Sequence, residues 1–184
     1  MRTRRSTRRW RPQLSSSTLD VWQEIALDAE REGSLWRDAL RPRGARDCVL
    51  VFSPLAEERF ALAVETIYEG YLVHYGRPRL FAPGDHDTIL LLGDYLYAHG
   101  LVRLAAAGSV EAVADMGELI SRCAQLRAEG LKEDGPVWAA SVALLGRGVL
   151  KESDDSETLV ASAKEAAGAE PVERALAAHL QRVR

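Results

Sequence analysis

The 184-residue chain has little cysteine and no long apolar run. The first shortage argues against a disulfide-rich protein, and the second argues against a membrane-spanning one. Its two cysteines, Cys48 and Cys123, have no CxxC spacing and no nearby histidine pair. We interpret them as small core residues rather than as a disulfide or a metal site. Free thiols favour a reducing compartment, so we predict a cytoplasmic protein. No stretch approaches the roughly 20 apolar residues that span a bilayer, and no integral membrane span is expected.

Several motifs that carry chemistry are also missing. The sequence has no Gly-rich phosphate loop, no Cys/His zinc spacing, no nucleophile elbow and no helix-turn-helix signature. Apolar residues at 47% and charged residues at 28% are ordinary for a globular protein. The length suits one domain with a substantial core.

Positive charge is concentrated at the beginning of the chain. Residues 1–12 hold six arginines and no acidic residue, so the rest of the chain is acidic. We expect residues 1–14 to form a basic disordered arm. It could contact anionic lipid, nucleic acid or an acidic protein, or it could be a tail without a partner. It lacks the apolar segment of a secretory signal, so cleavage for export is not expected.

Beyond this arm, the periodicity of apolar residues is helical and predicts an all-α fold. We expect a helical domain over residues 15–152, whose helices cover about 15–32, 54–75, 88–104, 113–126 and 136–150. Asp85 is a natural cap for the third of these helices. Residues 48–52 are β-prone and form either a buried extended piece or the start of the next helix. Two C-terminal helices over residues 153–184 owe most of their apolar content to alanine, so we expect them to be weakly packed.

Two neighbouring stretches carry a family resemblance. The stretch VETIYEGYLVHYGRP, residues 64–78, follows the pattern V-E-x-I-H-x-x-x-L-V-H and a loop that ends in a proline. The stretch TILLLGDYLYAHG, residues 88–100, contains L-x-G-D-x-L. Together they resemble two consecutive helices of the trans-isoprenyl diphosphate synthases, the polyprenyl synthetase family. The resemblance covers about residues 58–150 and implies a truncated isoprenoid-synthase-like helical bundle.

The acidic metal-binding motifs of that family are absent. Tyr75 and Gly76 stand where two aspartates should follow His74, and nothing after Leu150 matches the second aspartate-rich motif. Prenyl transfer needs Mg²⁺ held between two carboxylate clusters to stabilise the departing diphosphate. The resemblance therefore implies a chain without catalytic residues, cofactor or metal of its own. It is closest to the noncatalytic small subunit of bacterial heptaprenyl diphosphate synthase.

The resemblance also names candidate site residues. Arg77 and Arg79 could hold a diphosphate, since the guanidinium fork suits phosphate oxygens; the alternative is a surface or interface role. His74, Gly93 and Asp94 occupy family-motif positions, and helix packing is the alternative explanation for each.

Three functions remain open from the sequence. The first is a noncatalytic subunit that pairs with a catalytic prenyl synthase; the protein partner that we expect is such a synthase or a second copy of this chain. The second is an active prenyl or terpenoid transferase with an altered site, in which Asp85, Asp87 or Glu65 would serve as substitute Mg²⁺ ligands. The third is a repurposed helical domain that binds an isoprenoid or a protein partner.

Overall fold

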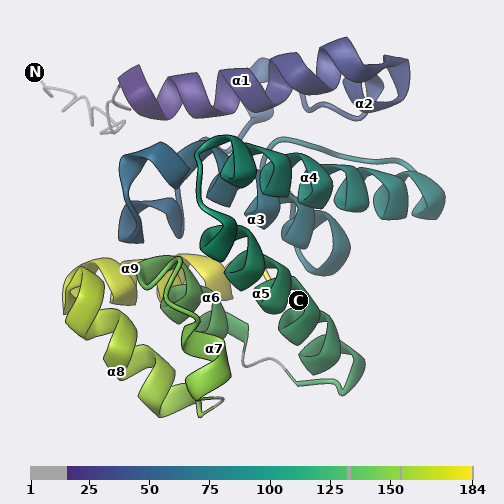
Figure 1. Cartoon of the computed structure of the whole chain (residues 1–184). Helices are drawn as coiled ribbons and strands as arrows, with labels where there is room; N and C mark the ends of the chain where they lie inside the picture. Colours follow the sequence, from purple (N-terminus) through teal and green to yellow (C-terminus); the bar gives the residue numbers. More distant parts are fainter. Residues whose placement is uncertain (1–15, 132–133, 154, 184) are drawn as a thin grey trace, which may run out of the picture.

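Helices dominate the part of the chain that the computed structural model describes, residues 16–131, 134–153 and 155–183 (Figure 1). Within these ranges only two isolated β-bridges occur and no sheet, which confirms the predicted all-α class. The α-helices are α1 (Ser16–Glu32), α2 (Ser34–Asp38), α3 (Ala61–Tyr75), α4 (His86–Ala106), α5 (Val110–Ala128), α6 (Asp134–Ala143), α7 (Val149–Glu152), α8 (Ser156–Ala167) and α9 (Ala169–Leu180). The predicted basic arm, residues 1–14, lies outside the described residues.

The start of α4 follows the capping signal of the sequence, whereas the start of α3 does not. The carboxylate of Asp85 accepts a hydrogen bond from the Thr88 N–H at 2.8 Å and caps α4, as predicted. The helix expected from Pro54 begins later, because two 3₁₀ turns, Ser53–Leu55 and Glu58–Phe60, precede α3. The backbone is extended at Ala56 and Glu57, which separates the turns.

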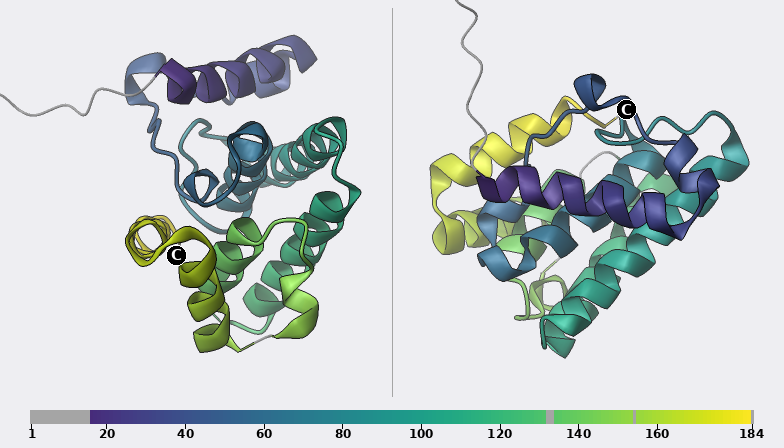
Figure 2. Two further views of the ribbon diagram at one scale, coloured as in Figure 1. Left: turned by 60° about the vertical axis from the view of Figure 1, so that its left-hand side comes forward. Right: turned by 90° about the horizontal axis from the view of Figure 1, so that it is seen from above.

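Helix α3 lies at the centre of the fold (Figures 1 and 2). Helix α4 runs along it, α1 forms a layer on one side, and α6, α8 and α9 gather on the other. The larger core cluster joins α3 to α5, α6, α8 and α9, and a smaller cluster fills the space between α1 and the α3–α4 pair. The central position of α3 buries most of its side chains whatever their polarity.

The C-terminal helices pack more firmly than their alanine content suggests. Leu159 and Ala163 of α8 and Val172 and Ala175 of α9 are buried in the larger core cluster. Small side chains let these helices approach α6 closely. The prediction of weak packing for residues 153–184 considered only the small apolar area of alanine and not this close approach. They belong to the main core.

Helix α4 alone, among the described residues, is long and apolar enough to cross a membrane by length and composition. One such helix is weak evidence for a membrane protein. It packs along α3 through Leu92, Leu96 and Leu104 and contacts α5. No integral membrane protein is indicated by this arrangement.

Candidate functional site

A buried ionic cluster lies between α3 and the segment that follows it. Glu65 and Glu69 are one helical turn apart and therefore share a face of α3. Arg79 reaches both: its Nη1 lies 2.6 Å from Glu65 Oε2, and its Nε lies 3.0 Å from Glu69 Oε2. All three side chains are almost fully buried, with Arg79 only 2% exposed. One cation thus faces two anions inside the protein.

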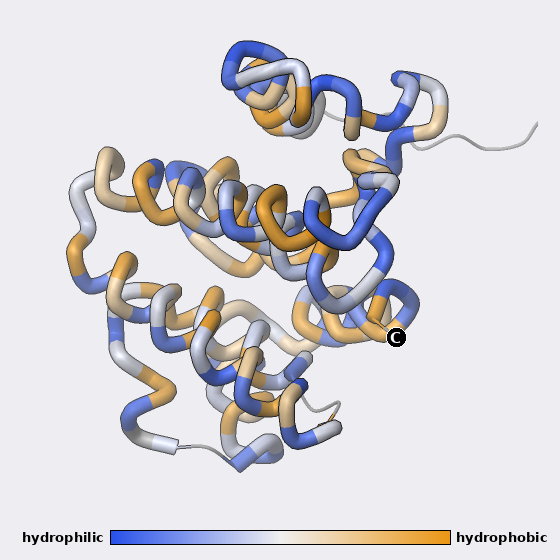
Figure 3. The backbone as a smooth tube through the Cα atoms, turned by 90° about the vertical axis from the view of Figure 1, so that its right-hand side faces the viewer, coloured by the Kyte–Doolittle hydropathy of each residue, from blue (hydrophilic) through white to orange (hydrophobic). Residues whose placement is uncertain are grey.

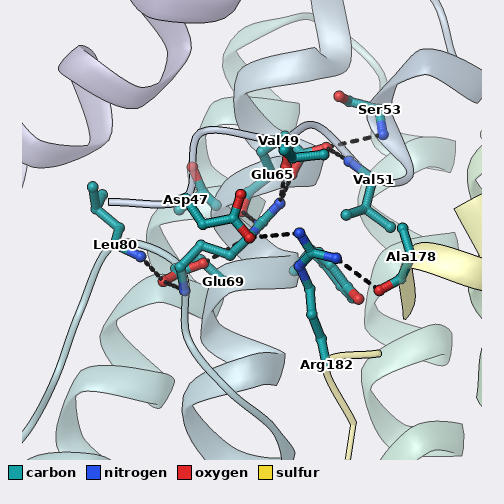
Figure 4. A network of polar contacts seen from close by, with 12 residues as sticks. Asp47, Val49, Val51, Ser53, Glu65, Glu69, Leu80, Ala178 and Arg182 are labelled. Atoms are coloured by element: carbon teal, nitrogen blue, oxygen red, sulfur yellow. Dashed lines mark hydrogen bonds and ion pairs between the residues drawn. The ribbon is translucent and has the colours of Figure 1, made fainter. Parts of the chain in front are cut away.

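Backbone N–H groups compensate the remaining carboxylate charge (Figure 4). Glu65 Oε1 accepts hydrogen bonds from the N–H groups of Val51 and Ser53, both at 3.1 Å. Glu69 Oε1 accepts from the N–H groups of Arg79 and Leu80 at 2.8 and 2.7 Å. The two carboxylates therefore fasten two irregular segments of chain to α3.

The surroundings of Arg79 keep it charged and occupied. Burial by itself would lower the pKa of Arg79, but the carboxylates of Glu65 and Glu69 outweigh burial and raise it. The guanidinium also donates to the Val49 carbonyl at 2.9 Å and lies over the ring of Trp22. A diphosphate at Arg79 would have to compete with two carboxylates for the guanidinium.

A surface cavity of about 230 Å³ lies just outside the cluster, lined by Asp47, Arg77, Pro78, Arg79, Gln181 and Arg182. Arg77 is exposed, and its side chain has no hydrogen-bond or ion-pair partner within the described part of the chain. Arg182 donates to Asp47 at 2.5 Å and to the Ala178 carbonyl at 2.8 Å (Figure 4). The cavity brings together the two arginines that the sequence predicted.

Sequence reasoning missed the third arginine of this cavity. Arg182 follows α9, far along the chain from Arg77, and no local pattern connects them. The fold joins the two segments by a bridge between Gly76 and Val183 and by a hydrogen bond from the Arg77 N–H to the Arg182 carbonyl at 2.8 Å. Such a pairing depends on tertiary structure alone.

The three family-motif positions meet at the α3–α4 contact. His74 Nε2 lies 3.2 Å from Asp94 Oδ1, and the His74 ring covers Gly93, where a methyl group would overlap it. Burial lowers the pKa of His74, although Asp94 partly opposes this effect. The three residues make a close helix crossing, which agrees with the packing explanation.

A second buried network centres on Asp134, at the start of α6. Its Oδ1 lies 3.2 Å from His179 Nε2, and its Oδ2 accepts from Tyr71 and from Arg127, the latter at 2.7 Å. His179 Nδ1 lies 2.9 Å from the hydroxyl of Tyr68. The network ties α3, α5, α6 and α9 together. No sequence motif indicated this network, because its members are far apart in the sequence.

This network changes the ionisation of Asp134. Burial would raise the pKa of the carboxyl, but hydrogen bonds from His179 and Tyr71 and the charge of Arg127 outweigh it, so the pKa falls to about 2. Burial, together with the neighbouring Asp134 carboxylate, raises the pKa of Tyr71. Asp134 is therefore ionised and Tyr71 protonated at neutral pH.

The proposed substitute metal ligands do not converge. Glu65 is buried against Arg79, whereas Asp85 caps α4 and Asp87 is exposed. Among the residues that the structure describes, no group of three or more His, Cys, Asp or Glu side chains is placed to hold a metal ion.

One face of α4 is apolar and exposed. Leu91 is 55% and Val102 is 66% exposed, and Leu90 lies beside Leu91. Figure 3 shows the apolar stretches along this helix.

Comparisons of the chain with models of protein families, with curated proteins and with solved structures found no match. Function is therefore inferred from side chains and their geometry.

Proposed function

We propose that this chain is a noncatalytic subunit in polyprenyl diphosphate synthesis, which acts by pairing with a catalytic prenyl synthase through the exposed face of α4. The observation that carries the proposal is the apolar stripe on that helix. The family resemblance of residues 58–150 supplies the identity of the partner. In this proposal the protein works in the cytoplasm, with Cys48 and Cys123 as free thiols.

The exposed residues of α4 recur at helical spacing. Leu91, Asp94, Ala98, Val102 and Ala105 are all exposed and follow one another at intervals of three or four residues, so they line one face. Asp94 is the one charged residue on this face. Isolated apolar side chains are common on surfaces, but several of them along one helix face are typical of a protein interface. Ala98 and Ala105 leave room for a partner helix to approach closely.

The polar interior of α3 supports a role without catalysis. Its two carboxylates, Glu65 and Glu69, are bound inside the protein by Arg79 and by backbone N–H groups. Carboxylates in such an arrangement would have to give up Arg79 before they could bind Mg²⁺. An assisting subunit needs only the scaffold and the docking face.

Co-purification tests the proposal. The tagged chain is expressed together with full-length trans-polyprenyl diphosphate synthases from its own organism, and the eluted complex is assayed for product chain length. We expect a stable complex with altered product length. The double substitution Leu91→Asp/Val102→Asp should abolish the complex, because it places two charges on the apolar face.

A matched control uses another exposed leucine. Leu180→Asp, at the end of α9, changes a side chain that is 67% exposed but lies away from α4, and it should leave the complex intact. If no synthase binds the wild-type chain, the identity of the partner is wrong. If the double variant binds as well as the wild type, the docking face is wrong.

The arginine cavity favours a second candidate, a domain that binds an isoprenoid diphosphate. Arg77 and Arg182 lie on the same cavity, and guanidinium pairs suit phosphate oxygens. Calorimetric titration with farnesyl diphosphate in the absence of Mg²⁺ should then show binding that Arg77→Ala abolishes. An unchanged heat for that variant would reject this candidate.

A further inference from the structure

The segment of residues 47–50 belongs to no helix, leads into a bend at Val51, and has backbone groups on two different sides. On the inner side, the Asp47 N–H donates to the Arg79 carbonyl at 3.1 Å, and the Val51 N–H donates to Glu65. The Val49 carbonyl, on the same side, accepts from Arg79. In an extended chain the N–H and C=O of one residue point the same way, and those of its neighbours point the opposite way. The N–H groups of Asp47 and Val51 and the C=O group of Val49 therefore point inward, although the Asp47 and Val49 side chains are exposed.

The outer side of this segment is unpaired. By this alternation the N–H and C=O groups of Cys48 and Leu50 point outward. Within the described residues these groups have no hydrogen-bond partner. Both residues are partly exposed. The outer side is thus a short free strand edge, which is a template for another strand.

Two surface cavities lie beside this edge. One, of about 270 Å³, is lined by Trp22 and Ala26 of α1 and by Arg46 and Cys48. The other, of about 460 Å³, is bounded by residues 49–51 and by α9. Figure 2 shows the segment running along the surface from the α1 layer toward α9. Side chains of an added strand would meet a cavity toward each end.

The charge beside the edge is positive. Arg43 and Arg46 line the first cavity with Glu30, and Arg174 lines the second. Asp47, the acidic residue of the segment itself, is already paired with Arg182. Arg174 forms an exposed ion pair with Glu170, which offsets the positive charge of Arg174 only in part. An acidic strand would complement this surface, although the chain as a whole is acidic.

From these observations we infer a second docking surface: the outer edge of residues 47–51 binds an extended, acidic peptide segment of a partner protein by strand addition. Backbone hydrogen bonds to Cys48 and Leu50 hold the peptide, and apolar side chains beside its acidic residues enter the two cavities. This surface shares no residue with the exposed face of α4 and does not depend on the function proposed above.

The test selects its own ligand. The full-length chain is panned against a phage-displayed library of linear nine-residue peptides. We expect enriched sequences that combine Asp or Glu with apolar residues. Binding of the enriched peptide should slow amide hydrogen exchange at Cys48 and Leu50, measured by NMR on ¹⁵N-labelled protein.

Two substitutions at one position isolate the backbone contribution. Cys48→Pro removes the outer N–H, whereas Cys48→Ala keeps it, so the proline variant should bind the enriched peptide at least about tenfold more weakly than the alanine variant. Circular dichroism verifies that both fold. Val49→Glu, which adds a carboxylate beside the edge and leaves the outer N–H groups in place, should also weaken binding, whereas Val49→Lys should not.

Three outcomes would overturn the inference. They are a library that yields no enriched peptide, an enriched peptide that protects amides elsewhere, and equal binding by Cys48→Pro and Cys48→Ala. Sedimentation of the wild-type chain alone adds a fourth: a dimer that Cys48→Pro dissociates would show that a second copy, not a foreign peptide, occupies the edge.

Discussion

Helices α3 and α4 lie side by side, but α3 buries charged side chains whereas α4 exposes apolar ones. Helix α3 is buried along most of its length and yet contains Glu65 and Glu69, whereas α4 is rich in leucine and yet exposes Leu91 and Val102. The buried charges of α3 are compensated within the chain by Arg79 and by backbone N–H groups. The exposed apolar face of α4 has no such compensation among the described residues. Position in the fold, rather than the character of the helix, decided what each one buries.

The largest effect should come from breaking the compensation inside α3. Arg79→Met leaves two buried carboxylates without their cation, and we expect the free energy of unfolding to fall by about 3–5 kcal/mol. Urea denaturation measures it. Arg77→Met, two residues away and exposed, should change stability by less than about 0.5 kcal/mol. Similar values for the two variants would mean that the buried cluster does not hold α3 in place.

The buried network around Asp134 should make the stability of the fold sensitive to acid. The pKa of Asp134 is about 2 in the folded protein, below the ordinary value of about 3.9. Because the pKa of Asp134 is lower in the folded than in the unfolded protein, its ionised form stabilises the fold at pH values above the unfolded pKa. This contribution to the free energy of unfolding is lost as pH falls from about 4 to about 2. We expect a loss on the order of 2 kcal/mol over this window.

Denaturation at several pH values checks the assignment to Asp134. Asp134→Asn should be less stable at neutral pH and should show a shallower fall in acid. The exposed Asp87→Asn serves as a control and should keep the wild-type slope. An unchanged slope in Asp134→Asn would assign the acid sensitivity to another carboxylate.

A smaller effect should follow from changing the α3–α4 crossing. Gly93→Ala places a methyl group against the His74 ring, and we expect a loss of about 1–3 kcal/mol. Gly117→Ala, within α5 and with open space around it, should instead stabilise by about 0.5–1 kcal/mol. Adding His74→Ala should recover part of the loss, and a double-mutant cycle measures that coupling.

The smallest effect is expected on the exposed face of α4. Leu91→Lys should change the free energy of unfolding by less than about 0.5 kcal/mol, because the side chain leaves water only when a partner covers it. Leu96→Lys, on the buried side of the same helix, should cost several kcal/mol. Thermal unfolding compares the two. Equal losses would show that both sides of α4 are packed within the chain.

Much of the fold could be predicted from local signals. The period of apolar residues marked most of the helices, and Asp85 marked the start of α4. The candidate site could be predicted only in part. Arg77 and Arg79 do line one cavity, but Arg182 joins them from the far end of the chain. The ion partners of Arg79 could not be predicted, because nothing local distinguishes a buried arginine from an exposed one.

The sequence by itself determined most of the helices, the Asp85 cap and the absence of the expected aspartates after His74, because each depends on residues within a few positions of one another. Tertiary structure decided which charges are buried and which apolar residues are exposed. It placed Arg79 between Glu65 and Glu69, and it left the outer face of α4 uncovered. Burial depends on the packing of distant segments, and that information is spread over the whole chain.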